Sequence, residues 1–314
     1  AGKFNQARLH QGFHYPRSEE TIIQSKNGAI IYEERFPNVT KHIMKNIYLV
    51  REDGHVEIDE YLKIMKRNQL NFREIDISTS AFNYKSGGYA FKAIQVDEKY
   101  IDISTLNSQL LQEIRAQNIR VHCNQEVTSI YTDLGRLELI NGRKDDFDLI
   151  INCTYTDPFK GFSLNKCRLK YEYCTMLLIA SEEIRGQAIT IMDGEFVSVY
   201  PWLSNLHSVS SVKFTPAIKS DSLSELELLL SNRSVSDAKS SARAIEDHMR
   251  KLLDFNYTLI GDFSTIKVKL KEDTGDQRLV KTYSEGKCLT VLQGKLDAVS
   301  YFLADLSIRL EQLK

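Results

Sequence analysis

The sequence predicts an α/β protein built from two domains that are interleaved along the chain. Three observations support this fold class. Helix-like and strand-like segments alternate, and residues 147–155 contain an unbroken apolar run that is typical of a buried parallel strand. Residues 166–215 instead alternate polar and β-branched residues, as a mixed or antiparallel sheet does. No linker rich in Ser, Gly or Pro separates these segments, so the domains are expected to exchange segments along the chain.

The composition is that of a folded protein without a strong electrostatic preference. Of the 314 residues, 42% are hydrophobic and 26% are charged, which is enough for a substantial core. The formal net charge of −1 gives no global attraction to nucleic acid, and we expect no nucleic-acid partner. The five cysteines form no CxxC pair, which favours a reducing, cytoplasmic location. No apolar run reaches the roughly 18 residues of a membrane helix, so no integral membrane segment is expected.

The first elements are a helix, a strand and a second helix. Ser18 is a typical helix cap and predicts a helix over 19–34. We expect one apolar face on this helix, formed by Ile22, Ile23, Ala29, Ile30 and Ile31. A strand over 46–50, a turn and a helix over 57–67 follow.

The next unit, 94–154, begins with a strand and a turn. Ser104 is then expected to cap a helix whose leucines recur at helical spacing. Strands are predicted within 120–123, 126–133, 136–142 and 147–155. The last of these is expected to lie in a parallel sheet with both faces covered.

The remaining chain is predicted to form a sheet-rich region, two helices and a closing unit. Strands are expected within 171–180, 188–194, 196–203 and 207–214, and helices over 223–230 and 236–253. The closing unit contains a strand over 258–270, a polar turn over 272–280, a strand over 288–292 and a helix over 297–313.

Several stretches occur in a familiar order and spacing. They are ARLHQGFHY, VDEKYIDISTLNSQLLQEI, EVTSI, FDLIINCTYT and CLTVLQGKLDAVSYFLADL. In the order and spacing of these stretches, the chain resembles FAD-dependent oxidoreductases of the D-amino-acid oxidase and glycerol-3-phosphate dehydrogenase superfamily. The resemblance implies FAD as cofactor, and a Rossmann-like FAD/NAD(P)-binding domain made of 1–35, 95–160 and 258–314. It also implies an α+β substrate domain with a mixed or antiparallel sheet, made of 36–94 and 161–257.

The same resemblance implies a set of cofactor-binding residues. Arg8, Leu9, His10 and Gly12 match the stretch that passes the flavin ring in the family, where glycine lets the backbone approach a flat cofactor. The other implied residues are Val127, near the adenine; Thr154, near the phosphates; and the turn Gly294, Lys295 and Leu296, near the flavin's pyrimidine oxygens.

Two departures from the family pattern bear on cofactor binding. The sequence contains no GxGxxG loop, which holds the pyrophosphate in this fold. Tyr155 also stands where the family has the glycine of an A-T-G stretch. One interpretation is that an N-terminal strand, loop and helix that carry the GxGxxG motif are missing from this sequence. The other is a relative that kept the fold, lost the cofactor and serves as a binding or scaffold protein.

The resemblance also implies the reaction. Hydride would pass to flavin from a carbon that bears an amine or a hydroxyl, in a small and anionic amine or hydroxy-acid substrate. Arg278 resembles the family arginine that binds the substrate's acid group, and its alternative is a turn arginine paired with Asp273 or Asp276. His10 is the second catalytic candidate, as a polar group beside the flavin.

His14 and Tyr200 complete the predicted substrate site. Each has an alternative interpretation as a surface or packing residue. The histidines and cysteines show no zinc spacing, so no metal site is expected. The sequence leaves open whether the protein is a homo-oligomer.

Overall fold

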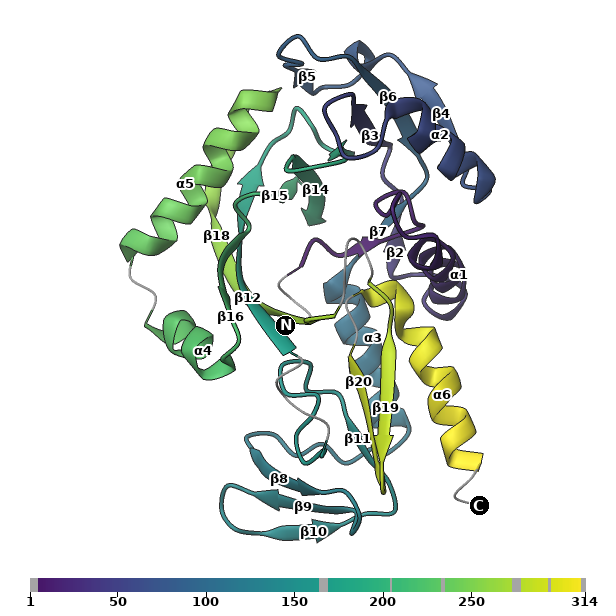
Figure 1. The fold of residues 1–314 in the computed structure, drawn as a ribbon, viewed down its shortest axis with the longest axis vertical. Helices are drawn as coiled ribbons and strands as arrows, with labels where there is room; N and C mark the ends of the chain where they lie inside the picture. The colour runs from purple at the N-terminus through teal and green to yellow at the C-terminus, as the bar shows by residue number, and fades with distance from the viewer. Residues whose placement is uncertain are drawn as a thin grey trace.

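The computed structural model describes residues 5–163, 169–203, 205–232, 235–272, 278–292 and 295–311. Its largest element is a nine-stranded mixed sheet in the order β16-β12-β15-β14-β13-β3-β6-β4, with β18 paired to β12 (Figure 1). The strands are β3 (Lys45–Arg51), β4 (Phe72–Ile75), β6 (Phe91–Val96), β12 (Leu169–Ala180), β13 (Gln187–Met192), β14 (Val197–Leu203), β15 (Leu206–Ser211), β16 (Pro216–Ser220) and β18 (Thr258–Leu270). Strands β3 and β13 are parallel, and the other neighbouring pairs are antiparallel. The predicted mixed α/β class is confirmed.

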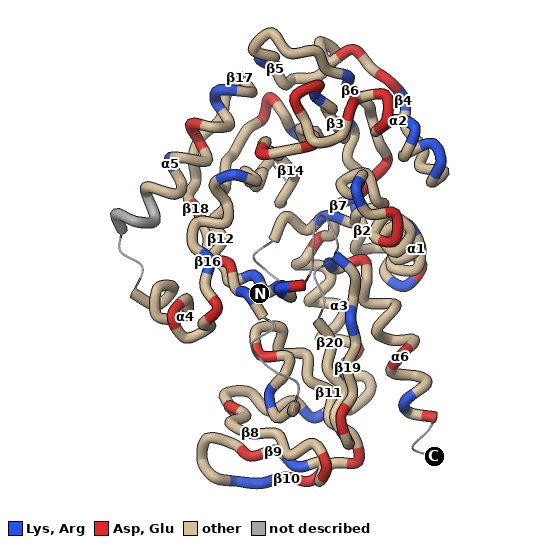
Figure 2. Tube along the Cα trace, in the orientation of Figure 1, with Lys and Arg blue, Asp and Glu red and all other residues tan. Residues whose placement is uncertain are grey.

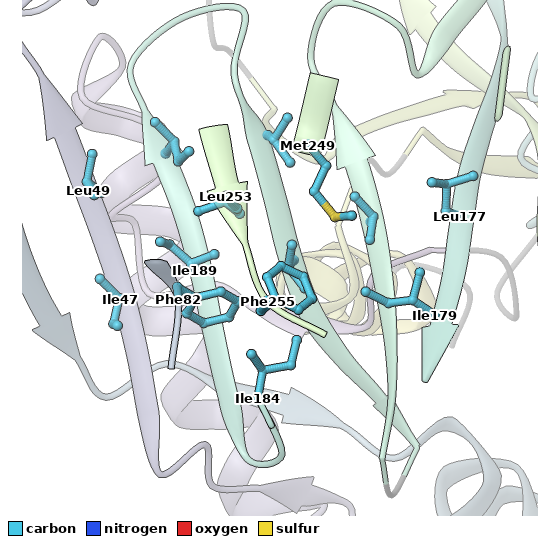
Figure 3. Packing of buried hydrophobic residues seen from close by; sticks show 14 of the residues in the cluster. Ile47, Leu49, Phe82, Leu177, Ile179, Ile184, Ile189, Met249, Leu253 and Phe255 are labelled. Atoms are coloured by element: carbon cyan, nitrogen blue, oxygen red, sulfur yellow. The ribbon is translucent and has the colours of Figure 1, made fainter. Parts of the chain in front are cut away.

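One face of this sheet is apolar and is covered by helices α4 (Leu223–Ser231) and α5 (Val235–Leu252). Successive side chains of a strand point to opposite faces, so Leu177 and Ile179 of β12 lie on the same face. They pack with Met249 of α5 in the main hydrophobic cluster (Figure 3). The opposite face of the sheet is directed toward the N-terminal segment and β7, as Figure 1 shows.

Shorter strands and helices complete the fold. Strands β1 (Arg8–Leu9) and β2 (Thr40–Lys41) flank β7 (Lys99–Ile101). The other elements are α1 (Glu19–Arg35), α2 (Ile58–Arg67), η1 (Ile77–Thr79), β5 (Asn83–Tyr84), α3 (Ile103–Ala116), β8 (Val127–Tyr131), β9 (Arg136–Leu139), β10 (Lys144–Asp146), β11 (Ile150–Asn152), β17 (Leu253–Asp254), β19 (Lys281–Glu285), β20 (Cys288–Leu292), η3 (Leu296–Ala298) and α6 (Val299–Glu311).

Helix α1 packs closely against the turn η3. Gly28 of α1 makes this contact possible, because an added Cβ atom would lie 2.2 Å from the carbonyl oxygen of Asp297. No side chain fits in that space, so the glycine sets the distance between the helix and the turn.

The predicted helices are found, with two corrections. Ser18 caps α1, as predicted, but the predicted apolar face is wrong. Ile22 and Ala29 are buried, seven residues or two turns apart, whereas Ile23, Ile30 and Ile31 are exposed on other sides of the helix. The cap of α3 is also not Ser104. It is the Asp102 side chain, which accepts hydrogen bonds from the backbone N–H groups of Ser104 and Thr105.

The predicted strands need three corrections. Residues 120–123 form no strand, whereas β10, β16 and β19 were not predicted because they are short and polar and lack apolar alternation. The parallel pairing predicted for 147–155 is confirmed, since Ile150 of β11 pairs with Cys288 of β20. Its expected coverage on both faces is wrong for the part of the chain described, because Ile151 is 42% exposed.

The pairing of β18 bears on the predicted domain boundary. The prediction places 258–270 in the cofactor-binding domain, but β18 pairs with β12 along its whole length. Strand β18 therefore completes the sheet that contains β12, which the prediction assigned to the substrate domain. The rest of the predicted division remains a proposal.

Charged residues of both signs are interspersed along the chain (Figure 2). None of the helices in the described ranges combines the length and the apolar character that a membrane crossing requires. Within the same ranges, no three His, Cys, Asp or Glu side chains are grouped as metal ligands.

Candidate functional site

Several of the side chains predicted to form the site lie on the polar face of the nine-stranded sheet. Ile189 and Val199 belong to the cluster on the apolar face, so their neighbours Thr190 and Tyr200 point to the other side. Arg8 of β1 lies against that side. Its guanidinium carbon is 4.2 Å from the centre of the Tyr200 ring, and its Nη1 donates a hydrogen bond to Thr190 Oγ1 at 2.8 Å. The structure therefore brings the predicted Arg8 and Tyr200 together.

Arg8 is a buried cation with unused donors. The residue is only 6% exposed, and its Nε and Nη2 atoms have no hydrogen-bond partner in the described part of the chain. Leaving buried donors unpaired is costly, so these groups are suited to an acceptor from a ligand. Leu9, the next residue, is buried in a hydrophobic cluster that also includes Leu296.

A buried carboxylate holds the loop that follows β1. Glu98 Oε1 accepts a hydrogen bond from the Gln11 backbone N–H at 2.7 Å, and its Oε2 accepts one from the Tyr48 hydroxyl at 2.6 Å. Burial raises the pKa of Glu98. Sequence analysis assigned no role to Glu98, although it lies in the stretch VDEKYIDIS, and none to Tyr48; both are far from the loop in the sequence.

Gly12 is required by the same loop. Its φ is +117°, and an added Cβ would lie 2.8 Å from Ile22 Cγ2. Both the backbone conformation and the close approach to α1 exclude a side chain. The loop therefore passes tightly over the start of α1, and the cofactor-binding role predicted for Gly12 stays a prediction.

Two histidines and a tyrosine follow in this loop and contact one another. The ring centroids of His10 and His14 are 5.6 Å apart, and those of His10 and Tyr15 are 5.3 Å apart. The Nδ1 atoms of both histidines are buried and have no hydrogen-bond partner among the described residues. The predicted His10 and His14 thus form one cluster with free ring nitrogens.

Both histidines are neutral because their surroundings disfavour a positive charge. Burial first, and then the charges of Arg8 and Arg278, lower the pKa of His14 to about 3. The pKa of His10 is also well below its usual value, because of burial first and then the neighbouring His14 and Arg8. Neutral imidazoles can accept a hydrogen bond or a proton from a bound molecule.

A lysine that sequence analysis missed faces this cluster from β18. Lys267 alternates with Ile266 and Val268, which are buried on the other face of the sheet. Burial first, and then the charges of Arg278 and Lys269, lower the pKa of Lys267 to about 8. Glu172, which lies opposite Lys267 on β12, acts on the pKa of Lys267 in the other direction and raises it. The alternating stretch IKVKLK was the signal that could have identified it.

The predicted Lys295 is buried between α1 and η3. Its Nζ donates a hydrogen bond to Ser25 Oγ, lies 3.6 Å from Asp297 Oδ2 and lies 4.9 Å from the centre of the Tyr15 ring. Burial lowers the pKa of Lys295 and raises the pKa of Asp297. The predicted Gly294 lies outside the described residues.

Arg278 lies beside the same cluster. Its backbone N–H donates to Thr21 Oγ1 at 3.3 Å, and its charge lowers the pKa of His14 and Lys267. These interactions place Arg278 beside His14 and Lys267, and its role in binding the substrate stays a prediction. Its alternative partners, Asp273 and Asp276, lie outside the described residues.

Val127 and Thr154 are in a different part of the structure. The Val127 carbonyl accepts a hydrogen bond from Lys160 Nζ at 2.9 Å, and the Thr154 hydroxyl donates to Asn152 Oδ1 at 2.8 Å. No contact joins either residue to the Arg8 and histidine cluster in the described part of the chain, and their predicted role stays a prediction.

Tyr155 has the backbone conformation of the glycine that it replaces. Its φ is +63°, in the left-handed region that favours glycine. Its hydroxyl accepts a hydrogen bond from the Val268 backbone N–H at 3.3 Å, and its ring packs in the cluster beside β18. The side chain therefore supports the strand that carries Lys267.

Comparison with models of known families finds no match for the chain. Among curated proteins, it is 26% identical to the FAD-dependent monooxygenase FPY4 of Fusarium mangiferae, over 95% of this chain and 77% of that protein. It is also 26% identical to the FAD-dependent monooxygenase kojA of Aspergillus flavus, over 62% of this chain and 47% of that protein.

Solved structures share the fold at low sequence identity. Glycine oxidase from Geobacillus kaustophilus superposes with a TM-score of 0.65 at 11% identity, over 96% of this chain and 83% of that one. NikD, an unusual amino acid oxidase, gives 0.65 at 12% identity, over 94% and 80% of the two chains. The FAD-dependent oxidoreductase PA4991 from Pseudomonas aeruginosa gives 0.58 at 10% identity, over 98% and 79%. The predicted resemblance is confirmed: the chain has the fold of these FAD-dependent oxidases and is similar in sequence to FAD-dependent monooxygenases.

Proposed function

We propose that the native protein is a FAD-dependent oxidoreductase that oxidises a C–N or C–O bond of a small anionic amine or hydroxy acid. The observation that carries the proposal is the cluster on the polar sheet face. It combines unused Arg8 donors with the neutral His10 and His14 rings on a glycine-containing loop. This cluster occurs in a fold shared with amino acid oxidases.

Arg8, His10 and Gly12 together suit the binding of a flavin ring. Arg8 Nε and Nη2 are hydrogen-bond donors without a partner among the described residues, and His10 Nδ1 is a polar ring atom without one. Gly12 has no side chain that would cover the loop backbone. Such groups suit the carbonyl oxygens and nitrogens along one side of the flavin ring. The sequence contains no GxGxxG loop, and the resemblance places only Thr154 near the phosphates.

Bound FAD would supply an acceptor for two electrons and a hydride. The residues of this chain would bind and orient the substrate. Arg278 would bind the substrate's acid group, because a guanidinium matches the two oxygens of a carboxylate. The neutral His10 and His14 would accept the hydrogen of the substrate's amine or hydroxyl, and the Tyr200 ring, stacked on Arg8, would form the wall of the site.

The visible spectrum of the purified native protein tests the proposal. We expect bands near roughly 370 and 450 nm that remain in the supernatant after the protein is denatured by heat, as a dissociable flavin requires. Serum albumin treated in the same way is the control for light scattering. A colourless protein that takes up no added FAD would contradict the proposal and would indicate a fold kept for binding.

A further inference from the structure

We infer that Glu98 is a positioning residue of this site: it holds the loop over residues 10–12 in place, and its charge makes the bound flavin harder to reduce. This inference rests on the proposed function, because it concerns the same loop and the flavin that would bind along it. Three hydrogen bonds of Glu98 connect strand β3 of the large sheet to the loop backbone.

The register of β1 and β7 brings Glu98 next to the loop. Leu9 of β1 pairs with Lys99 of β7 in an antiparallel ladder. The next residue of the loop, His10, therefore comes opposite Glu98. The ladder ends here, and the Glu98 side chain supplies the acceptor instead, since its Oε1 accepts from the Gln11 backbone N–H at 2.7 Å. A carboxylate thus holds an N–H group just beyond the end of the strand.

Glu98 is itself fixed by strand β3 of the large sheet. Ile47 and Leu49 pack on the apolar face, so their neighbours along the strand point to the polar face. Two of these neighbours, Asn46 and Tyr48, are fully buried and bind Glu98. The Tyr48 hydroxyl donates to Glu98 Oε2 at 2.6 Å, and Asn46 Nδ2 donates to the Glu98 backbone carbonyl at 3.0 Å. Both the side chain and the backbone of Glu98 are therefore tied to the sheet.

Tyr200 connects the same network to Arg8. Its hydroxyl accepts a hydrogen bond from Asn46 Nδ2 at 3.3 Å, and the Arg8 guanidinium stacks on its ring. The sheet therefore holds both ends of the segment 8–11, one end through Tyr200 and the other through Glu98. This segment carries the groups that the proposed function assigns to the flavin ring.

Glu98 places a charge as well as a hydrogen-bond acceptor beside the loop. The residue is 1% exposed, and its two side-chain oxygens accept one hydrogen bond each, an arrangement that suits an ionised carboxylate. Water screens a buried charge poorly, so this charge acts on groups that bind nearby. Reduction adds negative charge to a flavin, and a flavin along this loop is therefore harder to reduce while Glu98 is charged.

The reduction potential of the flavin in the native protein tests the effect of the charge. Glu98→Gln keeps an oxygen that can accept from the Gln11 N–H but removes the charge. We expect the potential, measured by anaerobic titration against a reference dye, to rise by about 30 mV or more, which is a tenfold change in the two-electron equilibrium constant. Glu246→Gln is the matched control, because Glu246 lies on α5 over the other face of the sheet and pairs with Arg250. Its potential should equal that of the wild type.

Hydrogen exchange at the Gln11 amide tests the position of the loop, and it needs no flavin chemistry. In the wild type this amide should be protected although it lies beyond the end of β1, because Glu98 binds it. Glu98→Ala leaves the amide without this acceptor and should increase its exchange rate at least about tenfold. Melting curves of each variant would show whether it is folded.

Three results would overturn the inference. They are an unchanged potential in Glu98→Gln, an equal rise in Glu246→Gln, and rapid exchange of the Gln11 amide in the wild type. A merely structural role of Glu98 would lower the Tm of Glu98→Gln and leave the potential unchanged. If Glu98→Gln does not fold, the exchange measurement on the wild type still decides whether the loop is held. A flavoprotein whose potential ignores Glu98 refutes only the inference, whereas a colourless wild type that takes up no FAD refutes the proposed function.

Discussion

Replacing Lys267 by Met should stabilise the protein at neutral pH. In the folded protein, burial and neighbouring cations lower the pKa of Lys267 from 10.5 to about 8. At about 1.36 kcal/mol per pKa unit, a lowering of this size costs about 3 kcal/mol of unfolding free energy when the lysine is protonated. Met keeps most of the packing of the side chain and has no charge. Because Lys267 keeps some exposure to water, we expect a gain of about 1 to 3 kcal/mol at pH 7, or a few degrees in Tm.

The stabilising effect of Lys267→Met should depend on pH. Between pH 8 and 10.5 the unfolded chain binds more protons at Lys267 than the folded chain does, so the stability of the wild type rises with pH across this range. The advantage of Lys267→Met should therefore decline above pH 8 and vanish above about pH 10.5. Thermal unfolding of the wild type, Lys267→Met and Lys271→Met at several pH values measures this, and Lys271→Met is the control because Lys271 follows β18 and pairs with Asp221. A variant that is less stable at pH 7, or an advantage that does not change with pH, would refute the conclusion that the charge of Lys267 destabilises the folded protein.

Four further predictions follow from the contacts described. Gly28→Ala should destabilise the protein by about 1 to 3 kcal/mol, because its Cβ would overlap the backbone of η3, whereas Gly261→Ala, with no atom within 4 Å, should be nearly neutral in the same unfolding experiment. Tyr155→Phe should cost about 1 kcal/mol in urea unfolding, since it removes the acceptor of a backbone N–H of β18. The pKa of His14 is lowered to about 3 in the folded protein, so below pH 6.5 the unfolded chain binds more protons than the folded chain does. The wild type should therefore lose stability as the pH falls from 6.5 toward 3, and His14→Asn should lose less. If the Tm of the two proteins fell in parallel with pH, this prediction would be contradicted. Arg278→Leu should raise KM far more for an acidic substrate than for a neutral analogue, and equal effects on both would count against its role.

The fold follows from the sequence where local patterns are strong. The 258–270 strand and the 288–292 strand were predicted with the bounds that the structure has, because both are long apolar or alternating runs. Strand β10 was missed, since Lys144–Asp146 is charged and is held only by its pairing with β9. The position of β18 in the sheet was also missed, because pairing between distant strands leaves no local trace.

The candidate site was predictable only where a motif marks it. Arg8, His10 and Gly12 were identified by their resemblance to the family, and the structure places them in one loop. Glu98 and Lys267 were not, because their importance depends on burial and on charges that come together only in the folded chain.

A crystal structure of the native protein with its bound cofactor would test the central claim most directly. We predict electron density for a flavin ring alongside the loop that contains Arg8, His10 and Gly12, with a ring oxygen or nitrogen within hydrogen-bond distance of the free Arg8 donors. A structure in which Arg8 keeps these donors unpaired, and in which flavin is absent or bound elsewhere, would contradict the account.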